Sequence, residues 1–262
     1  MNFLRGQVLV FDKPLGMTSF QLVAKVRWLI TRAMGGRKLK VGHAGTLDPL
    51  ASGLMLLCTG RATKQIEQLQ AGVKAYEATL QLGATTPSYD LEHPVDHTFP
   101  TEHITEPLLR QVLHTFEGDI MQVPPVFSAC KVEGVRAYDM ARKGRGHEVT
   151  LQAKPLHIDE ISLTAFRPHT MQADIRVVCS KGTYIRALAR DIGEALHSGA
   201  HLIALRRTQV GNFTVQQAYT LPAFEEWLSQ QSIETDLDCP PSSRQPPRWP
   251  RTHSQQTKHQ HT

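Results

Sequence analysis

The sequence lacks the features that mark membrane-spanning, secreted and zinc-binding proteins. No stretch of about 18 residues is both apolar and free of charge, as a spanning helix requires, and no basic-then-apolar leader opens the chain. The four cysteines are scattered without a C-x-x-C pair, which argues against a zinc knuckle and a disulfide framework. We therefore expect a cytoplasmic protein with reduced thiols.

Cofactor-binding motifs are missing as well. The chain has neither a P-loop nor a dinucleotide-binding glycine fingerprint. Two histidine pairs, His93 with His97 and His197 with His201, have the i, i+4 spacing that can hold a metal on a helix. Neither pair has an adjacent HExxH-type acid, so solvated polar surface is the favoured interpretation and no metal or cofactor is expected.

Charge is distributed unevenly along the 262 residues, a length that fits one large domain or two small ones. Four of the cations that make up the net charge of +5 lie in residues 239–262, which contain no acid. Local basic clusters can bind phosphates, although solvated loop charge explains each cluster equally well. The two clusters comprise Arg32, Arg37, Lys38 and Lys40, and Arg142, Lys143 and Arg145.

Hydrophobic periodicity predicts a mixture of strands and helices without a βαβ rhythm, which favours an α+β fold. Thr18 or Ser19 is expected to cap the first helix and Thr183 the fifth. The expected strands are 7–11, 54–58, 76–82, 156–166, 173–179 and 207–215, and the expected helices are 20–31, 62–70, 106–116, 138–142, 184–197 and 221–231.

Two segments depart from this pattern. Residues 122–146 form a long stretch punctuated by glycine and proline, and a segment of this size inside a compact chain is usually functional. From residue 232 onward the chain is rich in Pro, Ser, Gln and His with little to bury, so 232–262 is predicted to be a disordered basic tail after a domain that spans 1–231.

The segment VGHAGTLDPLASGLML, residues 41–56, surrounds one acid, Asp48, with small and apolar residues. An Asp-Pro pair is often only a turn. Alternatively, a carboxylate on a loop of small residues can be approached closely by a planar substrate and act as a nucleophile. A second segment, CSKGTYIRALARDIGEAL, places Arg186 where it can hold that carboxylate bidentately. The competing interpretation is a surface arginine paired with Asp191 or Glu194.

Six ordered blocks between about residues 8 and 215 resemble the TruB family of tRNA pseudouridine synthases. The GTLDP context of Asp48 separates this family from synthases whose catalytic Asp lies in an R-L-D triplet. The blocks are DKPLGMTSF, HAGTLDPLASG, KAYEATLQLGATTPSYD, QVPPVFSACKVEGVRAYDMARKG, SKGTYIRALARDIG and LRRTQVGNF.

The resemblance implies a pseudouridine synthase fold, with a central mixed, mostly antiparallel sheet flanked by helices and a thumb-like insert at about 122–146. It implies isomerisation of uridine to pseudouridine at position 55 in the tRNA T loop, with Asp48 as nucleophile and without metal or cofactor. Attack on the ribose and attack on the uracil ring both remain open. The target base must be flipped out, at a cost of a few kcal/mol, and an aromatic platform can return about 1–3 kcal/mol.

Further roles follow from the same resemblance. Tyr76 would stack on the base, Tyr184 would pack beside it, and Arg186 would pair with Asp48. Leu205 would line the apolar wall, and His43 would occupy space vacated by flipped bases. In the thumb-like insert, Lys131, Arg136, Arg142 and Lys143 are suitable phosphate contacts to the T arm.

A C-terminal PUA module, which many relatives carry, is not expected within 232–262, and nothing in the sequence indicates an obligate oligomer, so a monomer is expected. Two alternatives to a stand-alone synthase stay open: a catalytically inactive chaperone that binds the T arm, and a guide-RNA-dependent synthase of the dyskerin type.

Overall fold

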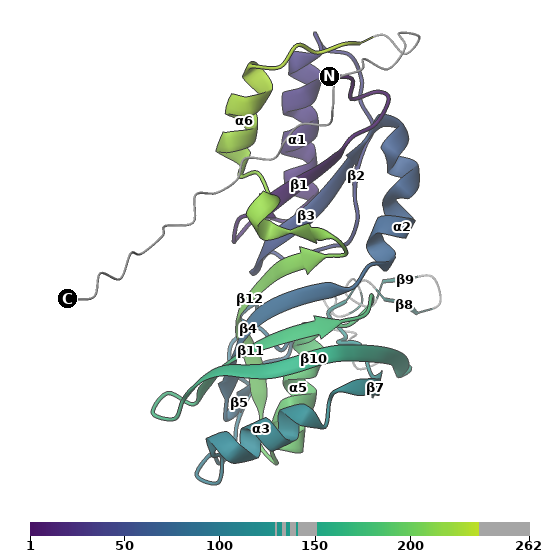
Figure 1. Ribbon diagram of the computed structural model, residues 1–262. Coiled ribbons are helices and arrows are strands. Elements are labelled where there is room, and N and C mark those ends of the chain that lie inside the picture. The colour runs from purple at the N-terminus through teal and green to yellow at the C-terminus, as the bar shows by residue number, and fades with distance from the viewer. Residues whose placement is uncertain (129, 133–134, 137–139, 141–150, 236–262) are drawn as a thin grey trace, which may run out of the picture.

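The computed structural model describes residues 1–128, 130–132, 135–136, 140 and 151–235. Within them a nine-stranded mixed sheet has the central order β1-β3-β12-β4-β11-β10-β7, with β2 on β3 and β13 on β12 (Figure 1). Every pairing in this sheet is antiparallel except that of β12 with β3. The α+β prediction and the mostly antiparallel sheet are thereby confirmed.

The strands and helices follow one another as a single series. The strands are β1 (Val8–Lys13), β2 (Val41–His43), β3 (Ala51–Thr59), β4 (Lys74–Leu82), β5 (Ala84–Thr85), β6 (His97–Thr98), β7 (Gly118–Gln122), β8 (Lys131–Val132), β9 (Val135–Arg136), β10 (Lys154–Arg167), β11 (Gln172–Cys179), β12 (Ala200–Val210) and β13 (Phe213–Thr214). The helices are α1 (Ser19–Ala33), α2 (Ile66–Ala71), α3 (Glu106–His114), α5 (Ile185–Ala195) and α6 (Leu221–Ser229), with 3₁₀ turns η1 (Gly60–Gln65) and η3 (Val215–Gln217).

Strand β12 joins two halves of the molecule. In Figure 1 the upper half holds β1, β2 and β3 with α1 and α6, and the lower half holds β7, β10 and β11 with α3 and α5. One large apolar core runs through both halves, and a smaller cluster that includes Val10, Leu54 and Leu56 lies on the other face of β1 and β3. Alternate residues of β1 supply the two clusters, as the period of a strand requires.

Three sequence expectations need correction. Thr183 does not cap α5, because its hydroxyl donates to the carbonyl of Ser180 and Tyr184 is the N-cap residue. Strand β12 begins at Ala200 rather than at 207, and the helix expected over 62–70 is divided into η1 and α2. Tertiary pairing of β12 with β4 overrides the local pattern there.

The histidine pairs do not lie on helices. His197 follows the end of α5 with φ of 51°, and His201 lies on β12. Among the described residues, no group of three or more His, Cys, Asp or Glu side chains is arranged to hold a metal. The same part of the chain contains no helix with the length and apolar character needed to cross a membrane.

The two segments that depart from the general pattern are described only in part. In the predicted thumb-like insert, β8 pairs antiparallel with β9, and the helix expected at 138–142 lies outside the described residues apart from position 140. At the start of the predicted tail, the N–H of Glu234 donates to the carbonyl of Met1 and Ile233 packs against the core. Residues 236–262 lie outside the described part.

Candidate active site

Asp48 lies in the loop that connects β2 to β3, and the first residue of α1 holds this loop in place. The backbone N–H of Leu47 donates to Oγ of Ser19 at 2.9 Å, and this hydroxyl donates to the carbonyl of Leu47 at 2.8 Å. Both bonds are buried. The N–H of Ala51 donates to the carbonyl of Asp48 at 3.1 Å and closes the turn. The position of the Asp48 backbone is therefore fixed by α1 and β3.

Arg207 on β12 supports the same loop from the sheet. Its guanidinium is almost completely buried and donates to the carbonyls of Gly45, Thr46 and Leu54 at 3.2, 3.3 and 2.8 Å. Gly53, with φ of 103°, lies opposite Arg207 in the parallel pairing, and a Cβ there would be 2.2 Å from the Arg207 carbonyl oxygen. Only glycine permits this approach of β3 to β12.

The Asp48 carboxylate pairs with Arg186 near the N-terminus of α5, as predicted. Nε of Arg186 lies 2.9 Å from Oδ2 of Asp48. The contact is not bidentate, because the two Nη atoms donate instead to the carbonyls of Ser88 and Phe127 at 3.1 and 2.8 Å. The Arg186 side chain is 7% exposed and that of Asp48 is 41% exposed. The alternative of a surface arginine paired with Asp191 or Glu194 is therefore wrong.

Asp90 is a second acid beside Arg186 that the sequence interpretation missed. Its Oδ2 lies 3.7 Å from Nε of Arg186, and its Oδ1 accepts hydrogen bonds from Oγ of Ser88 and from the N–H of Glu92. Asp90 is buried. The guanidinium thus lies between a buried carboxylate and a half-exposed one, and Asp90 fixes its position. Asp90 is the last residue of the KAYEATLQLGATTPSYD block, and this position is the sequence signal that could have identified it.

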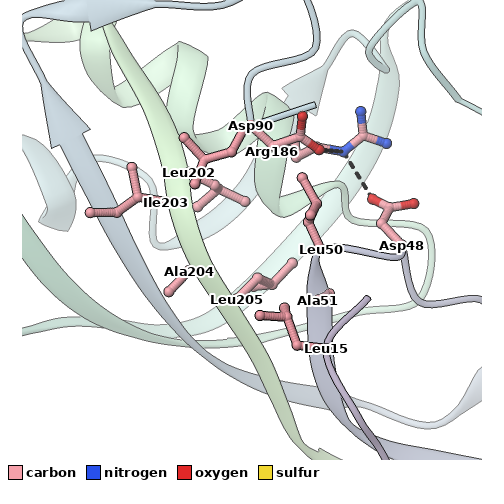
Figure 2. Close-up of a pocket in the computed structure, with 11 residues that line it drawn as sticks. Leu15, Asp48, Leu50, Ala51, Asp90, Arg186, Leu202, Ile203, Ala204 and Leu205 are labelled. Carbon is pink, nitrogen blue, oxygen red and sulfur yellow. Dashed lines mark hydrogen bonds and ion pairs between the residues drawn. The ribbon is translucent and has the colours of Figure 1, made fainter. Parts of the chain in front are cut away.

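Asp48 and Arg186 border a mostly apolar cavity of about 80 Å³. Figure 2 shows the ion pair at one end of this cavity and aliphatic side chains along its sides. The lining residues come from five segments: Leu15, Asp48, Leu50, Ala51, Asp90, Leu91, Arg186, Leu202, Ile203, Ala204 and Leu205. Leu205 therefore lies where the resemblance places it. Because the Asp48 side chain is partly exposed, the cavity is open to solvent at this end.

Two further cations, Arg207 and Lys13, lie near the Asp48 loop, and neither was singled out from the sequence. Lys13 is buried and its Nζ donates to the carbonyls of Pro14 and Met17 at 3.0 and 2.7 Å. Burial lowers the pKa of Lys13 to about 8, and the nearby charge of Asp48 opposes this shift while Arg207 adds to it. Asp48 therefore has one contacting cation, Arg186, and two further buried cations near its loop.

The two predicted tyrosines lie in different environments. Tyr76 is buried on β4, opposite Arg207 in the pairing with β12, and burial raises the pKa of its phenol while Arg207 opposes the rise. Tyr76 belongs to the core, and the described residues that line the cavity do not include it. Tyr184 is half-buried, exchanges two hydrogen bonds with Gln122 through its backbone, and has its hydroxyl 3.4 Å from Sγ of Cys130.

The remaining predicted residues lie outside the cavity or outside the described part. His43 on β2 is partly buried, and burial lowers the pKa of its imidazole, which favours the neutral form. Lys131 lies on β8, and its side chain is not described. Arg142 and Lys143 fall outside the described residues.

Two family models match most of the chain. Residues 32–185 match the TruB family pseudouridylate synthase N-terminal domain, and residues 186–239 match the tRNA pseudouridylate synthase B C-terminal domain. The chain is 60% identical to tRNA pseudouridine synthase B of Bacteroides fragilis over 89% of its own length and 99% of the relative. It is 43% identical to the Mycobacterium leprae protein of that name over 88% of this chain and 72% of the relative.

Solved structures show the same likeness. A crystal structure of a Cbf5-Nop10-Gar1 complex contains a chain that matches with a TM-score of 0.64 and 30% identity, over 86% of this chain and 55% of that one. This protein thus spans about half the length of that solved chain. Two family models together match residues 32–239, and the Bacteroides fragilis relative is matched over 99% of its length. The chain therefore belongs to the TruB family of pseudouridylate synthases.

Proposed function

We propose that this protein isomerises uridine to pseudouridine at position 55 in the T loop of tRNA, with Asp48 as the nucleophile and without metal or cofactor. The observation that carries the proposal is the position of the Asp48 carboxylate at the mouth of an apolar cavity. Arg186 holds one of its oxygens, and no described residue donates a hydrogen bond to the other. A relative with 60% identity is named tRNA pseudouridine synthase B.

The geometry supports separate roles for the cavity wall and for Asp48 in this reaction. The everted uracil enters beside Leu205, and its arrival covers Asp48, which strengthens the electrostatic contacts in the site. The free oxygen of Asp48 attacks either the ribose anomeric carbon or the uracil ring. The glycosidic C–N bond breaks, the uracil turns, and C5 bonds to the ribose. The hydrogen on C5 leaves as a proton and the former glycosidic nitrogen gains one, so the reaction needs no external reactant.

The aromatic and basic residues would hold the RNA. Tyr76 is our candidate for stacking on the base because it lies in the KAYEATLQLGATTPSYD block, where the resemblance places the stacking tyrosine. Tyr184 is the N-cap residue of α5, two positions before Arg186, and would pack beside the base. His43 would fill space left by flipped bases. In the thumb-like insert, Lys131, Arg142 and Lys143 would contact T-arm phosphates.

Replacement of Asp48 tests the proposal. With purified protein and tRNA transcript tritiated at uracil C5, we expect the native chain to release tritium, and Asp48→Asn and Asp48→Ala to release none. Both variants should bind tRNA with nearly native affinity, because Asp48 carries little of the RNA contact. A tRNA with cytidine at position 55 serves as the substrate control.

The same experiment separates the alternatives. If native and variant proteins bind tRNA and neither releases tritium, the protein is a T-arm chaperone. If the native protein releases tritium only when a guide RNA is added, it is a synthase of the dyskerin type. The likeness to the Cbf5 chain raises the second possibility, whereas the near-complete match to relatives named tRNA pseudouridine synthase B favours a stand-alone enzyme.

A further inference from the structure

The segment on either side of the Asp48 loop is almost free of acids. Residues 13–66 contain nine cations and one acid, Asp48 itself. Of the nine, Lys13 is buried and the other eight are exposed. The exposed cations are Lys25, Arg27, Arg32, Arg37, Lys38, Lys40, Arg61 and Lys64. We call this set the basic face.

Helix α1 presents the first three of these cations on its outer side. Its opposite side supplies the buried residues Leu22, Val26 and Ile30 among others, so the cations face solvent. Trp28 is 50% exposed between them, with Nζ of Lys25 at 4.8 Å and Cζ of Arg32 at 5.4 Å from its ring centroid. The indole holds both cations on one surface through cation–π contacts.

No described carboxylate lies within 4.0 Å of any cation of the basic face. Elsewhere on the described surface, Arg110 is paired with Glu106, Arg167 with Asp174 and Arg176 with Glu160. Like charges gathered without counter-charges repel one another, and a polyanion relieves that repulsion.

The basic face lies along a helix that starts at the proposed active site and leads away from it. Ser19, the first residue of α1, bonds to Leu47 beside Asp48. Arg32 lies thirteen residues further along the helix, or about 20 Å at 1.5 Å per residue. Beyond α1, the N–H of Gly60 donates to the carbonyl of Lys40, so η1 with its exposed cations lies beside the loop that follows α1.

We propose that the basic face binds the phosphate backbone of the same tRNA outside the modified loop. The proposal rests on the proposed function, since it assumes that a T loop occupies the Asp48 cavity. An RNA that enters the cavity must continue outward, and cations without carboxylate partners that follow α1 to about 20 Å from Ser19 fit a regularly charged strand better than a compact anion. The contacts would be to phosphates and therefore independent of sequence.

The test compares two matched triple variants. Lys25→Gln, Arg27→Gln and Arg32→Gln together remove three cations from the outer side of α1. Arg110→Gln, Arg167→Gln and Arg176→Gln together remove three paired surface cations elsewhere and change the net charge equally. Thermal melts check that both variants fold. Dissociation constants are measured at several salt concentrations for full-length tRNA and for a hairpin limited to the T loop and a short stem.

For the α1 variant we expect the dissociation constant of full-length tRNA to rise roughly fivefold or more. The salt slope should fall by about one for each phosphate that the variant no longer neutralises. Binding of the hairpin, and tritium release from it, should stay native, and the control variant should behave as the native chain. Failure of the proposed function would appear separately, as absence of tritium release by the native protein.

Three results would overturn the proposal. Native binding of full-length tRNA by the α1 variant would leave an acidic protein or an anionic lipid surface as the partner of the basic face. Equal weakening for hairpin and tRNA would place the contacts at the loop itself. Equal weakening by the control variant would show a general effect of net charge rather than a binding surface.

Discussion

At the scale of single residues, the site depends on how the Arg186 guanidinium is divided between two carboxylates and two backbone carbonyls. A buried cation is costly unless its donors are satisfied. Here one edge serves two carboxylates, Asp48 and Asp90, and the Nη atoms serve two backbone carbonyls. Because the guanidinium is planar and held at several points, it orients Asp48 as well as neutralising it.

Arg186→Lys separates orientation from charge. The ammonium keeps a cation near Asp48 but cannot reach all the acceptors of a planar fork. We expect kcat for pseudouridine formation to fall about 100-fold, with tRNA affinity nearly unchanged. Arg190→Lys, one turn later on α5 and paired with Asp191, is the matched control and should keep most of the activity. Equal losses in the two variants would contradict the orienting role.

Only some residues around Asp48 could be predicted from the sequence. Motif resemblance gave the Asp48–Arg186 pair, although 138 positions separate the two residues. It did not single out Asp90, Lys13 or Arg207, although all three lie within the six blocks, because their positions near Asp48 and Arg186 follow from the fold rather than from local patterns. The bidentate geometry expected for Arg186 was wrong for the same reason, since its other acceptors are backbone carbonyls of distant segments.

At the scale of elements, the start of α1 has two separate tasks. Thr18 caps the helix through a capping box with Gln21, as the sequence predicted for Thr18 or Ser19. Ser19 holds Leu47 and thereby the Asp48 loop. Sequence patterns predicted the existence of most elements because periodicity is local. The start of β12 depends on pairing with β4, and this boundary was accordingly less accurate.

Ser19→Ala and Thr18→Ala test this division within one helix turn. Each should lower the free energy of unfolding by about 1 kcal/mol, because the first variant removes hydrogen bonds to the loop and the second removes the helix cap. Only Ser19→Ala should also lower kcat, because only it frees the Asp48 loop. Urea denaturation gives the stability and tritium release gives the rate. A similar loss of kcat in Thr18→Ala would assign the effect to helix stability.

At the scale of the whole molecule, the cations are distributed unevenly over the surface, and only some of them have carboxylate partners. The body up to residue 238 has 25 basic and 24 acidic residues, yet residues 13–66 hold nine cations and one acid. The sequence showed this imbalance only as local clusters, because exposure and pairing decide whether a cation is available. The structure pairs the arginines of α3, β10 and β11 and leaves those of α1 facing solvent.

Buried lysines make the stability of the molecule depend on pH. Burial lowers the pKa of Lys13 and of Lys74 to about 8, against 10.5 for the unfolded chain. Between these values the unfolded chain binds more protons, so the free energy of unfolding rises with pH. Burial also raises the pKa of the Cys58 and Cys179 thiols from 9.0 to about 11. The folded chain then keeps thiol protons that the unfolded chain loses above pH 9, which opposes the rise.

Between pH 8 and pH 9 the two lysines outweigh the two thiols. We expect the free energy of unfolding, measured with urea, to increase by about 1 kcal/mol across this interval. Lys13→Met should remove most of that increase, whatever its effect at a single pH, because each amine contributes about 1 kcal/mol over this pH unit and the thiols offset part of the sum. Lys25→Met on the exposed side of α1 should leave the increase intact. A flat or falling profile in the native chain would show that Lys13 and Lys74 keep ordinary pKa values. Lys13, the buried lysine near Asp48, would then stay charged throughout this range.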